Sequence, residues 1–326
     1  IDRFTKSNSN IISLTGDVNI QAGAHLIKMG GEYRTHKIRR YTGNPMGLAI
    51  PATGASSGWA GYRNNNFEYY GYSFDGTSEY DGEDDFFNSH SEAPKKPLYL
   101  AGYIQDKFEL ADLVLNFGLR LDHFNAKEQV AKDPLNPFGA RGTPGGGVFD
   151  ANDLEPSKAT TTVSPRLGFS FPITDKAVFH AQYGTFTQMP ALQYVLISKT
   201  WFDRYAGDAP FSTRIPNPNL KPERTISYEL GFKTLLSDNS ALSITGFYKE
   251  IKDLIQSRNI GTKADPAFPN SYESFVNVDF GTVKGFDIIF ELRRTKNIAV
   301  TLNYTLGFAN GTGSDPNTQS RLSWIQ

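Results

Sequence analysis

Apolar and polar residues alternate along much of this chain, with the period of two that is typical of β-strands. Between Leu113 and His123 every second residue is apolar, and the same alternation returns within residues 164–173, 275–294 and 298–309. A helix would scatter these side chains around its circumference, so the pattern excludes helix there. We expect about ten strands and very little helix. The expected strands lie near residues 9–21, 25–41, 97–109, 113–127, 164–173, 177–187, 223–235, 241–255, 275–294 and 298–309.

The connections between these strands alternate between very short and very long. Tight turns are expected near residues 23–24, 111–112, 174–175, 237–239 and 295–297. Long loops are expected near residues 42–96, 128–163, 188–223 and 256–273, far more than a hairpin requires. Short turns at one edge and long loops at the other are typical of a bacterial outer-membrane barrel.

The expected fold class is therefore all-β, an antiparallel up-and-down transmembrane β-barrel. Most of the strands reach the roughly 9–11 residues that a tilted strand needs to cross a bilayer. We expect a partial barrel of about ten strands with long extracellular loops, in which residues 1–326 belong to a single domain. The chain starts with Ile1-Asp2-Arg3 and shows no signal peptide, so we expect it to be an internal part of a longer protein.

Composition narrows the possible functions without changing this expectation. The net charge is -1, which offers no basic surface for nucleic acid, and the absence of cysteine excludes disulfides and thiolate metal sites. A mean hydropathy of -0.41 and the lack of a long apolar run exclude a transmembrane helix. A β-barrel remains compatible with these values, because only every second residue of its strands faces lipid.

Residues that could carry chemistry are sparse. The five histidines do not stand at metal-ligand spacing, and no catalytic triad or carboxylate pair can be defended. We therefore expect no enzyme activity, no cofactor and no metal site. The acidic run Asp81–Asp85 could hold a hard cation through its oxygens, but a solvated loop is the more common use of such a run.

Two groups of side chains are candidates for contact with a ligand. The first long loop is both aromatic and polar, which suits capture of a ligand or sugar, although the rings could equally pack the loop against its neighbours. Its candidates are Trp59, Tyr62, Tyr69, Tyr70, Tyr72 and Tyr80. The second group lies on the polar faces of the strands, where charges line a barrel lumen and mostly pair with one another. Its candidates are Arg34, Arg120, Asp122, Arg166 and Glu229.

Several motifs carry a resemblance to a known family. Residues 217–232 read NPNLKPERTISYELGF, which closely resembles a segment of TonB-dependent outer-membrane receptors where a loop re-enters a barrel strand. Further similar segments follow in the order of that family, and the opening hairpin at residues 28–34 is most similar to its Oar-like subgroup. The further segments are AGYIQDKF (101–108), LNFGLRLD (115–122), SPRLGF (164–169), AQYGTF (181–186) and VKGFD (283–287).

The resemblance implies a barrel of about twenty-two strands with an N-terminal plug. The plug and the C-terminal strands are not part of these residues. It also implies an energy-coupled receptor in the outer membrane of a Gram-negative bacterium, which imports a scarce ligand. The implied partners are outer-membrane lipid, an inner-membrane TonB-type energy-coupling protein that acts through the plug, and a small ligand, glycan or peptide. A secreted or surface all-β adhesion or glycan-binding protein with aromatic loops is the alternative.

Overall fold

The computed structural model describes residues 4–43, 67–73, 76–86, 91–135, 151–200, 214–261, 271–312 and 321–325. Within them, one 12-stranded sheet accounts for most of the chain. Its ten long strands are β1 (Phe4–Ala22), β2 (His25–Gly43), β4 (Leu98–Leu110), β5 (Leu113–Asn125), β8 (Thr160–Thr174), β9 (Ala177–Gln188), β10 (Glu223–Ser237), β11 (Ser240–Gly261), β12 (Ser271–Thr295) and β13 (Ile298–Thr312). All ten strands expected from the sequence are therefore confirmed, as are the five tight turns.

The remaining elements are short. β3 (Phe67–Tyr70) and β14 (Arg321–Ile325) extend the main sheet, while β6 (Gln129–Ala131) and β7 (Leu154–Pro156) form a separate two-stranded sheet. The described residues contain one single-turn helix, α4 (Leu192–Val195), and one 3₁₀ turn, η1 (Ala151–Asp153). None of these helices is long and apolar enough to cross a membrane.

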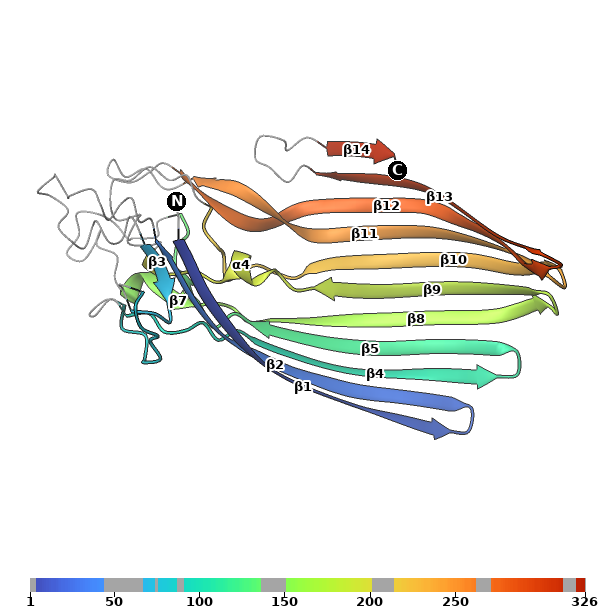
Figure 1. Cartoon of the computed structure of the whole chain (residues 1–326), viewed down its shortest axis with the longest axis horizontal. Helices are drawn as coiled ribbons and strands as arrows, with labels where there is room; N and C mark the ends of the chain where they lie inside the picture. Colours follow the sequence, from blue (N-terminus) through green and yellow to red (C-terminus); the bar gives the residue numbers. More distant parts are fainter. Residues whose placement is uncertain are drawn as a thin grey trace, which may run out of the picture.

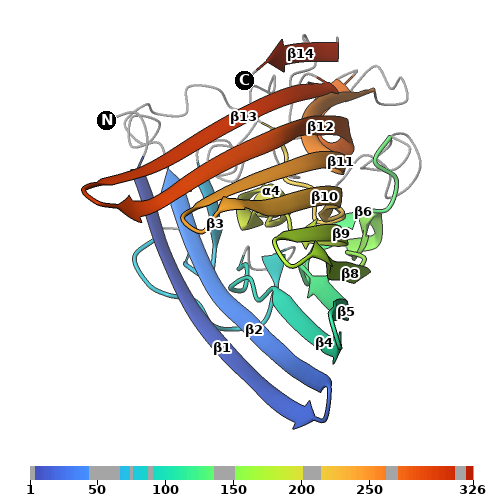
Figure 2. The same ribbon diagram turned by 90° about the vertical axis from the view of Figure 1, so that its right-hand side faces the viewer.

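Long strands that follow one another along the chain also lie next to one another in the sheet, and every pair is antiparallel (Figure 1). The sheet curves strongly but does not close, because within the described residues β1 pairs along its length only with β2, and β14 only with β13 (Figure 2). The up-and-down barrel topology is thus present as an open, curved wall.

The hairpin of β11 and β12 runs further than its sequence suggests. An irregularity between Ile251 and Ile255, where Asp253 has a φ of 60°, interrupts the alternation. Pairing then resumes and continues as far as Gly261 and Ser271. The expected loop at 256–273 is consequently shorter than predicted, because the irregularity hides the second half of the hairpin from a search for regular alternation.

Apolar side chains cover the outer face of the sheet and are exposed. Leu119, Leu230 and Leu302 are 43%, 59% and 60% exposed, respectively. A water-soluble sheet would bury such a face against a second layer, yet the described residues place no second sheet over it. Lipid is the solvent that this face fits.

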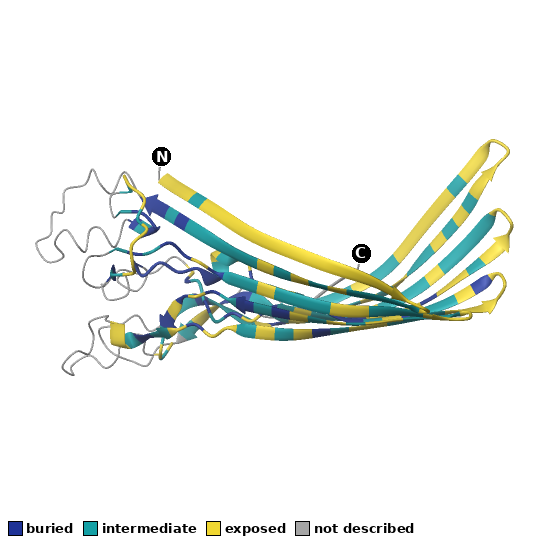
Figure 3. Cartoon of the chain, turned by 90° about the horizontal axis from the view of Figure 1, so that it is seen from below, coloured by how far each residue is buried: buried dark blue, intermediate teal, exposed yellow. Residues whose placement is uncertain are grey.

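The buried residues lie mostly at one end of the wall, the end opposite the tight turns (Figure 3). There the described parts of residues 67–97, 126–159 and 189–222 pack together; we call them the loop layer. Its apolar core contains Ala126, Val195 and Leu220, which pack with Phe124 of β5, and α4 lies inside the curve of the sheet (Figure 2). The loops therefore form a folded layer at one rim.

Candidate functional site

The five candidate charges of the polar faces share one side of the wall. Residues paired across antiparallel strands point to the same face. In the strand register, Arg34 lies opposite Tyr99, and Tyr99 lies opposite Phe124. Asp122 and Arg120 are two and four residues from Phe124 on the same strand, so they share its face. Gln182 lies opposite Gly168 on one side and Glu229 on the other, and Gly168 is two residues from Arg166. Arg120 lies opposite Ser164, which is also two residues from Arg166. The register therefore places all five on the inner face; their contact with a ligand stays a prediction.

Arg166 and Glu229 lie in one groove of this face. The groove has a volume of about 460 Å³, and its polar walls include Gln182, His180 and Ser227. The guanidinium of Arg166 stacks over the ring of Phe186, 4.7 Å from its centroid. The hydroxyl of Ser227 donates a hydrogen bond to Glu229 Oε1 over 3.3 Å. The groove thus presents a cation, an anion and neutral polar groups side by side.

Glycine creates part of the space in this groove. A Cβ atom on Gly231 would lie 2.1 Å from the imidazole ring of His180, and one on Gly184 would lie 2.9 Å from the ring of Phe186. Larger residues at these two positions would push both rings out of their sites. The glycines therefore allow a histidine and an aromatic ring to lie flat against the wall.

Arg120, Asp122 and Arg34 form a second cluster, nearer the loop layer. Arg120 Nε lies 3.0 Å from both carboxylate oxygens of Asp122, which is buried. The hydroxyl of Tyr99 donates to Asp122 and accepts from Arg120 Nη2 over 2.9 Å. The guanidinium of Arg34 lies 4.7 Å from the centroid of the Tyr99 ring. Arg120 and Asp122 are therefore paired with each other, whereas Arg34 forms its ion pair with Glu32 over 3.3 Å.

The aromatic candidates of the first loop are largely buried. Tyr69, Tyr70 and Tyr72 are 0%, 4% and 1% exposed, and burial raises the pKa of Tyr70 to about 12. Tyr80 is half-buried, and its hydroxyl donates to the carbonyl of Glu83 over 2.7 Å. Trp59 and Tyr62 lie outside the described residues. The described rings pack the loop, so ligand contact by them stays a prediction.

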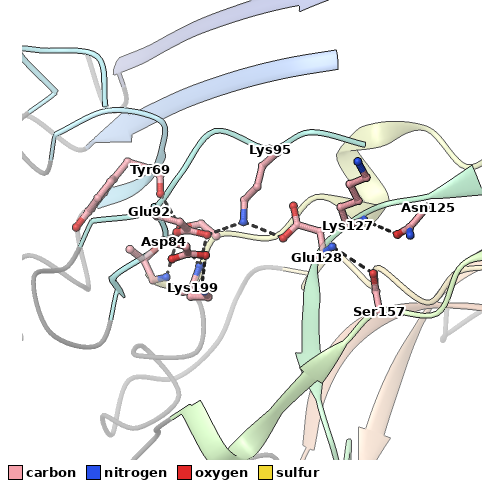
Figure 4. A network of polar contacts seen from close by, with 11 residues as sticks. Tyr69, Asp84, Glu92, Lys95, Asn125, Lys127, Glu128, Ser157 and Lys199 are labelled. Atoms are coloured by element: carbon pink, nitrogen blue, oxygen red, sulfur yellow. Dashed lines mark hydrogen bonds and ion pairs between the residues drawn. The ribbon is translucent and has the colours of Figure 1, made fainter. Parts of the chain in front are cut away.

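A buried ion network holds the loop layer together (Figure 4). We use this name for Asp84, Glu92, Lys95, Glu128 and Lys199. Lys95 Nζ lies 2.6 Å from Glu92 Oε1 and 2.8 Å from Glu128 Oε2, and Lys199 pairs with Asp84. The network therefore connects all three segments of the layer.

Sequence reasoning missed this network. Its members are separated by up to 115 residues, and each lies in a long loop without periodicity. The acidic run also takes part in ion pairs: Asp81 pairs with Lys37 and Arg39, and Asp84 pairs with Lys199. The described residues contain no group of three or more acidic or histidine side chains that could hold a metal ion.

A smaller cavity of about 240 Å³ opens in the loop layer. Its walls are mainly apolar and include Val130, Ile197, Ile215, Pro218 and Tyr272. Its polar groups are already engaged: the Tyr272 hydroxyl donates to a carbonyl over 2.9 Å, and the Asn217 amide donates to another over 2.9 Å. Such walls suit an uncharged group.

Comparison with known proteins agrees with this geometry. The family described as TonB dependent receptor-like, beta-barrel matches residues 2–325. Over 210 residues the chain is 25% identical to the iron-regulated outer membrane virulence protein of Vibrio cholerae serotype O1. That alignment covers 63% of this chain and 26% of the relative.

Solved structures show the same fold. The copper transporter OprC superposes with a TM-score of 0.53 at 14% identity, over 98% of this chain and 39% of that one. The siderophore receptor PirA from Pseudomonas aeruginosa gives a TM-score of 0.52 at 16% identity, over 95% of this chain and 46% of that one. The chain thus spans less than half the length of these relatives. With its family match over nearly every residue, the chain belongs to the TonB-dependent receptor β-barrel family and is a protein of the Gram-negative outer membrane.

Proposed function

We propose that this chain is part of the wall and outer mouth of an energy-coupled receptor that imports a scarce ligand across the outer membrane. The observation that carries this proposal is the division of the sheet into an apolar outer face and a polar, grooved inner face, with a folded loop layer over one rim. A solute crossing the membrane along this wall would meet polar groups throughout.

Import would require more than these residues. The free edges of β1 and β14 expose backbone groups that hydrocarbon does not satisfy, so further strands must complete the barrel. We expect a plug to fill the wide lumen, and a TonB-type partner in the inner membrane to move it. Both expectations rest on family membership.

The cargo we propose to test first is a small metal-carrying ligand. The names of the similar proteins include a copper transporter, a siderophore receptor and an iron-regulated protein. The inner groove offers support, because Arg166 and Glu229 present both charges to a polar solute. Glycans and peptides are the other cargo classes for comparison.

The test is uptake by cells that carry the full-length receptor, compared with cells from which its gene is deleted. We would supply radiolabelled iron on a panel of siderophores, then copper, a labelled glycan mixture and labelled peptides. We expect receptor-dependent uptake of a metal ligand that stops when the inner-membrane proton gradient is collapsed. Surface binding that persists without any gradient-dependent uptake would contradict import and favour the adhesion alternative.

Arg166→Ala would connect uptake to the groove. We expect it to slow uptake while leaving the amount of receptor in the membrane unchanged. Lys296→Ala, at the tight turn that joins β12 and β13, is the matched loss of a positive charge outside the groove and should leave uptake unchanged.

A further inference from the structure

The two buried carboxylates of the ion network, those of Glu92 and Glu128, differ in how many hydrogen bonds they accept (Figure 4). Glu92 accepts from Lys95 Nζ over 2.6 Å, from the Ser198 hydroxyl over 2.9 Å and from the backbone N–H of Lys199 over 3.0 and 3.1 Å. Among the described residues, the Glu128 side chain accepts only from Lys95 Nζ, over 2.8 Å at Oε2. Its other oxygen, Oε1, is buried and has no hydrogen-bond partner among the described residues.

The network also carries more negative than positive groups. Its three carboxylates face two ammonium groups, those of Lys95 and Lys199, which leaves one negative charge in surplus. Glu92 and Glu128 are 0% and 6% exposed, so water does not screen that charge. A buried, uncompensated charge is strongly unfavourable. A proton on Glu128 Oε1 would remove it and leave Oε2 free to accept from Lys95.

The position of Glu128 is fixed by its backbone. Its N–H donates to the Ser157 hydroxyl over 3.2 Å, and its carbonyl accepts from the Ser157 N–H over 2.8 Å. The preceding Lys127, with a φ of 53°, donates its N–H to the side chain of Asn125. If the three segments separated, Glu128 would move from a buried site into water together with the backbone around it.

We propose that Glu128 is a proton-operated clasp of the loop layer, binding one proton when the three segments are packed and releasing it when they separate. Burial raises the pKa of Glu128 from 4.5 to about 7, more than the attraction of Lys95 lowers it. The outer mouth of the receptor would then be more firmly closed in mildly acidic surroundings than in alkaline ones. This regulation does not depend on the identity of the cargo.

The charged and titratable groups that face Glu128 come from several elements. Burial also raises the pKa of Glu92, while hydrogen bonds from Lys95 Nζ, the Ser198 hydroxyl and the Lys199 N–H favour its ionised form. Unlike Glu128, Glu92 therefore has a donor at each carboxylate oxygen. Glu92 and Glu128 together raise the pKa of Lys95, so Lys95 stays protonated. Lys199 and Asp84 form an ion pair at the edge of the site. On the side of β2 and β3, Tyr70 lies 5.4 Å from Lys95 Nζ with Arg40 and Glu68 beside it, and the Tyr70 pKa of about 12 keeps it neutral.

The direction of the effect follows from proton binding. A pKa raised in the packed state means that the packed loops bind more protons than the separated loops between pH 4.5 and about 7. Their stability is therefore greatest below pH 4.5 and is lost as the pH rises through 7. For one such group, the equilibrium for loop opening should fall about twentyfold between pH 7.5 and pH 5.5.

Hydrogen–deuterium exchange of the full-length receptor in lipid nanodiscs would measure this opening. Protection factors, corrected for the chemical exchange rate at each pH, would be compared for peptides of the loop layer and of the strands. In the wild type we expect loop-layer protection to rise about twentyfold from pH 7.5 to 5.5, with the rise beginning near pH 7 and continuing at lower pH. Glu128→Gln, which mimics the protonated group, should show the high protection at both values.

Glu155→Gln is the matched control, because Glu155 lies in β7 opposite Val130 and outside the network. It should keep the pH dependence of the wild type. Wild-type protection that is flat or falls on acidification would overturn the clasp, whether or not the variants fold. A full pH response that survives in Glu128→Gln would overturn the assignment to Glu128.

Discussion

The wall and the loop layer follow opposite rules of burial. In the wall, Leu119 and Leu230 are exposed, and the strands are held by a continuous ladder of antiparallel pairs. In the loop layer, Glu92, Ser198 and Thr200 are fully buried and bonded to one another or to backbone. The difference follows from the solvent: lipid accepts apolar side chains but no bare backbone, whereas loops in water need a core of their own.

The two regions should therefore fail in different ways. In the wall, we expect polar substitutions on the inner face to cost little stability, and charged substitutions on the outer face to cost much more. The loop layer is strongly destabilised by the loss of one buried charge, because the opposite charge then stays buried without a partner. Substitutions that break one region and leave the other intact test this contrast.

Lys95→Met should have the largest effect, because it leaves Glu92 and Glu128 buried without their shared cation. Loss of one partner of a buried ion pair costs about 3–5 kcal/mol. We expect the loop layer to become sensitive to protease while the wall stays folded. Limited proteolysis and the heat-modified mobility of the barrel on gels would measure the two regions separately.

Lys96→Met is the control for this change, since the neighbouring Lys96 is exposed. It should leave protease resistance unchanged. Equal sensitivity of the two variants would show that the ion network contributes little to the loop layer.

Leu119→Arg should have the next largest effect, and it acts on the wall. It places a cation in lipid near the middle of β5, where the cost is about 2–4 kcal/mol. Urea titration of the full-length receptor folded into phospholipid vesicles would measure it. Asn303→Arg adds the same charge on the inner face of β13 and should cost less than about 1 kcal/mol. Similar losses in both would mean that the outer face has been assigned wrongly.

Arg120→Leu would not serve as a mild control, although Arg120 also lies on the inner face. Its guanidinium is the cation beside the buried Asp122, so its removal leaves that carboxylate unpaired. Position on the inner face is therefore not sufficient for tolerance; the pairing of each charge decides it.

The same contrast explains what the sequence revealed. Every long strand and every tight turn of the wall was predicted, because alternation is a local signal and each strand pairs with its neighbour along the chain. The five candidate charges of the polar faces were chosen by alternation alone, and a role for them stays a prediction. For β11 and β12, however, an irregularity near Asp253 interrupts the alternation, so the predicted strand ended there although the pairing continues beyond it.

The loop layer could not be predicted in this way. Lys95 contacts Glu128 across 33 residues, and Glu92 accepts from the Lys199 backbone across 107. Nothing in the local sequence of either carboxylate indicates that it is buried. Tyr69 and Tyr72 show the same difficulty, since an aromatic, polar loop has one sequence whether its rings face a ligand or pack inside.

Gly231→Ala should have a moderate effect on the inner face of the wall. The new Cβ would lie 2.1 Å from the ring of His180 and 2.9 Å from Thr245 Oγ1. Overpacking of this kind costs about 1–2 kcal/mol, limited here because the ring can swing into the groove. His180→Ala removes the closer of these two contacts, so Gly231→Ala should cost less stability in the His180→Ala background than in the wild type, in the same urea titration. An equal loss in both backgrounds would show that the His180 ring is not the source of the strain.

Lys6→Met should have the smallest effect, at the point where wall and loop layer meet. Lys6 Nζ lies 4.6 Å from the centroid of the buried Tyr72 ring, so β1 holds the first loop by a cation–π contact. At an exposed lysine this contact is worth about 0.5–1 kcal/mol. Methionine keeps most of the apolar stem and loses only the charge, whereas Lys6→Arg keeps both. We therefore expect slightly faster proteolysis of the first loop in Lys6→Met alone, with unchanged urea stability of the wall. If the wall weakened instead, the two regions would be coupled through β1, and the loop layer would contribute to the stability of the barrel edge.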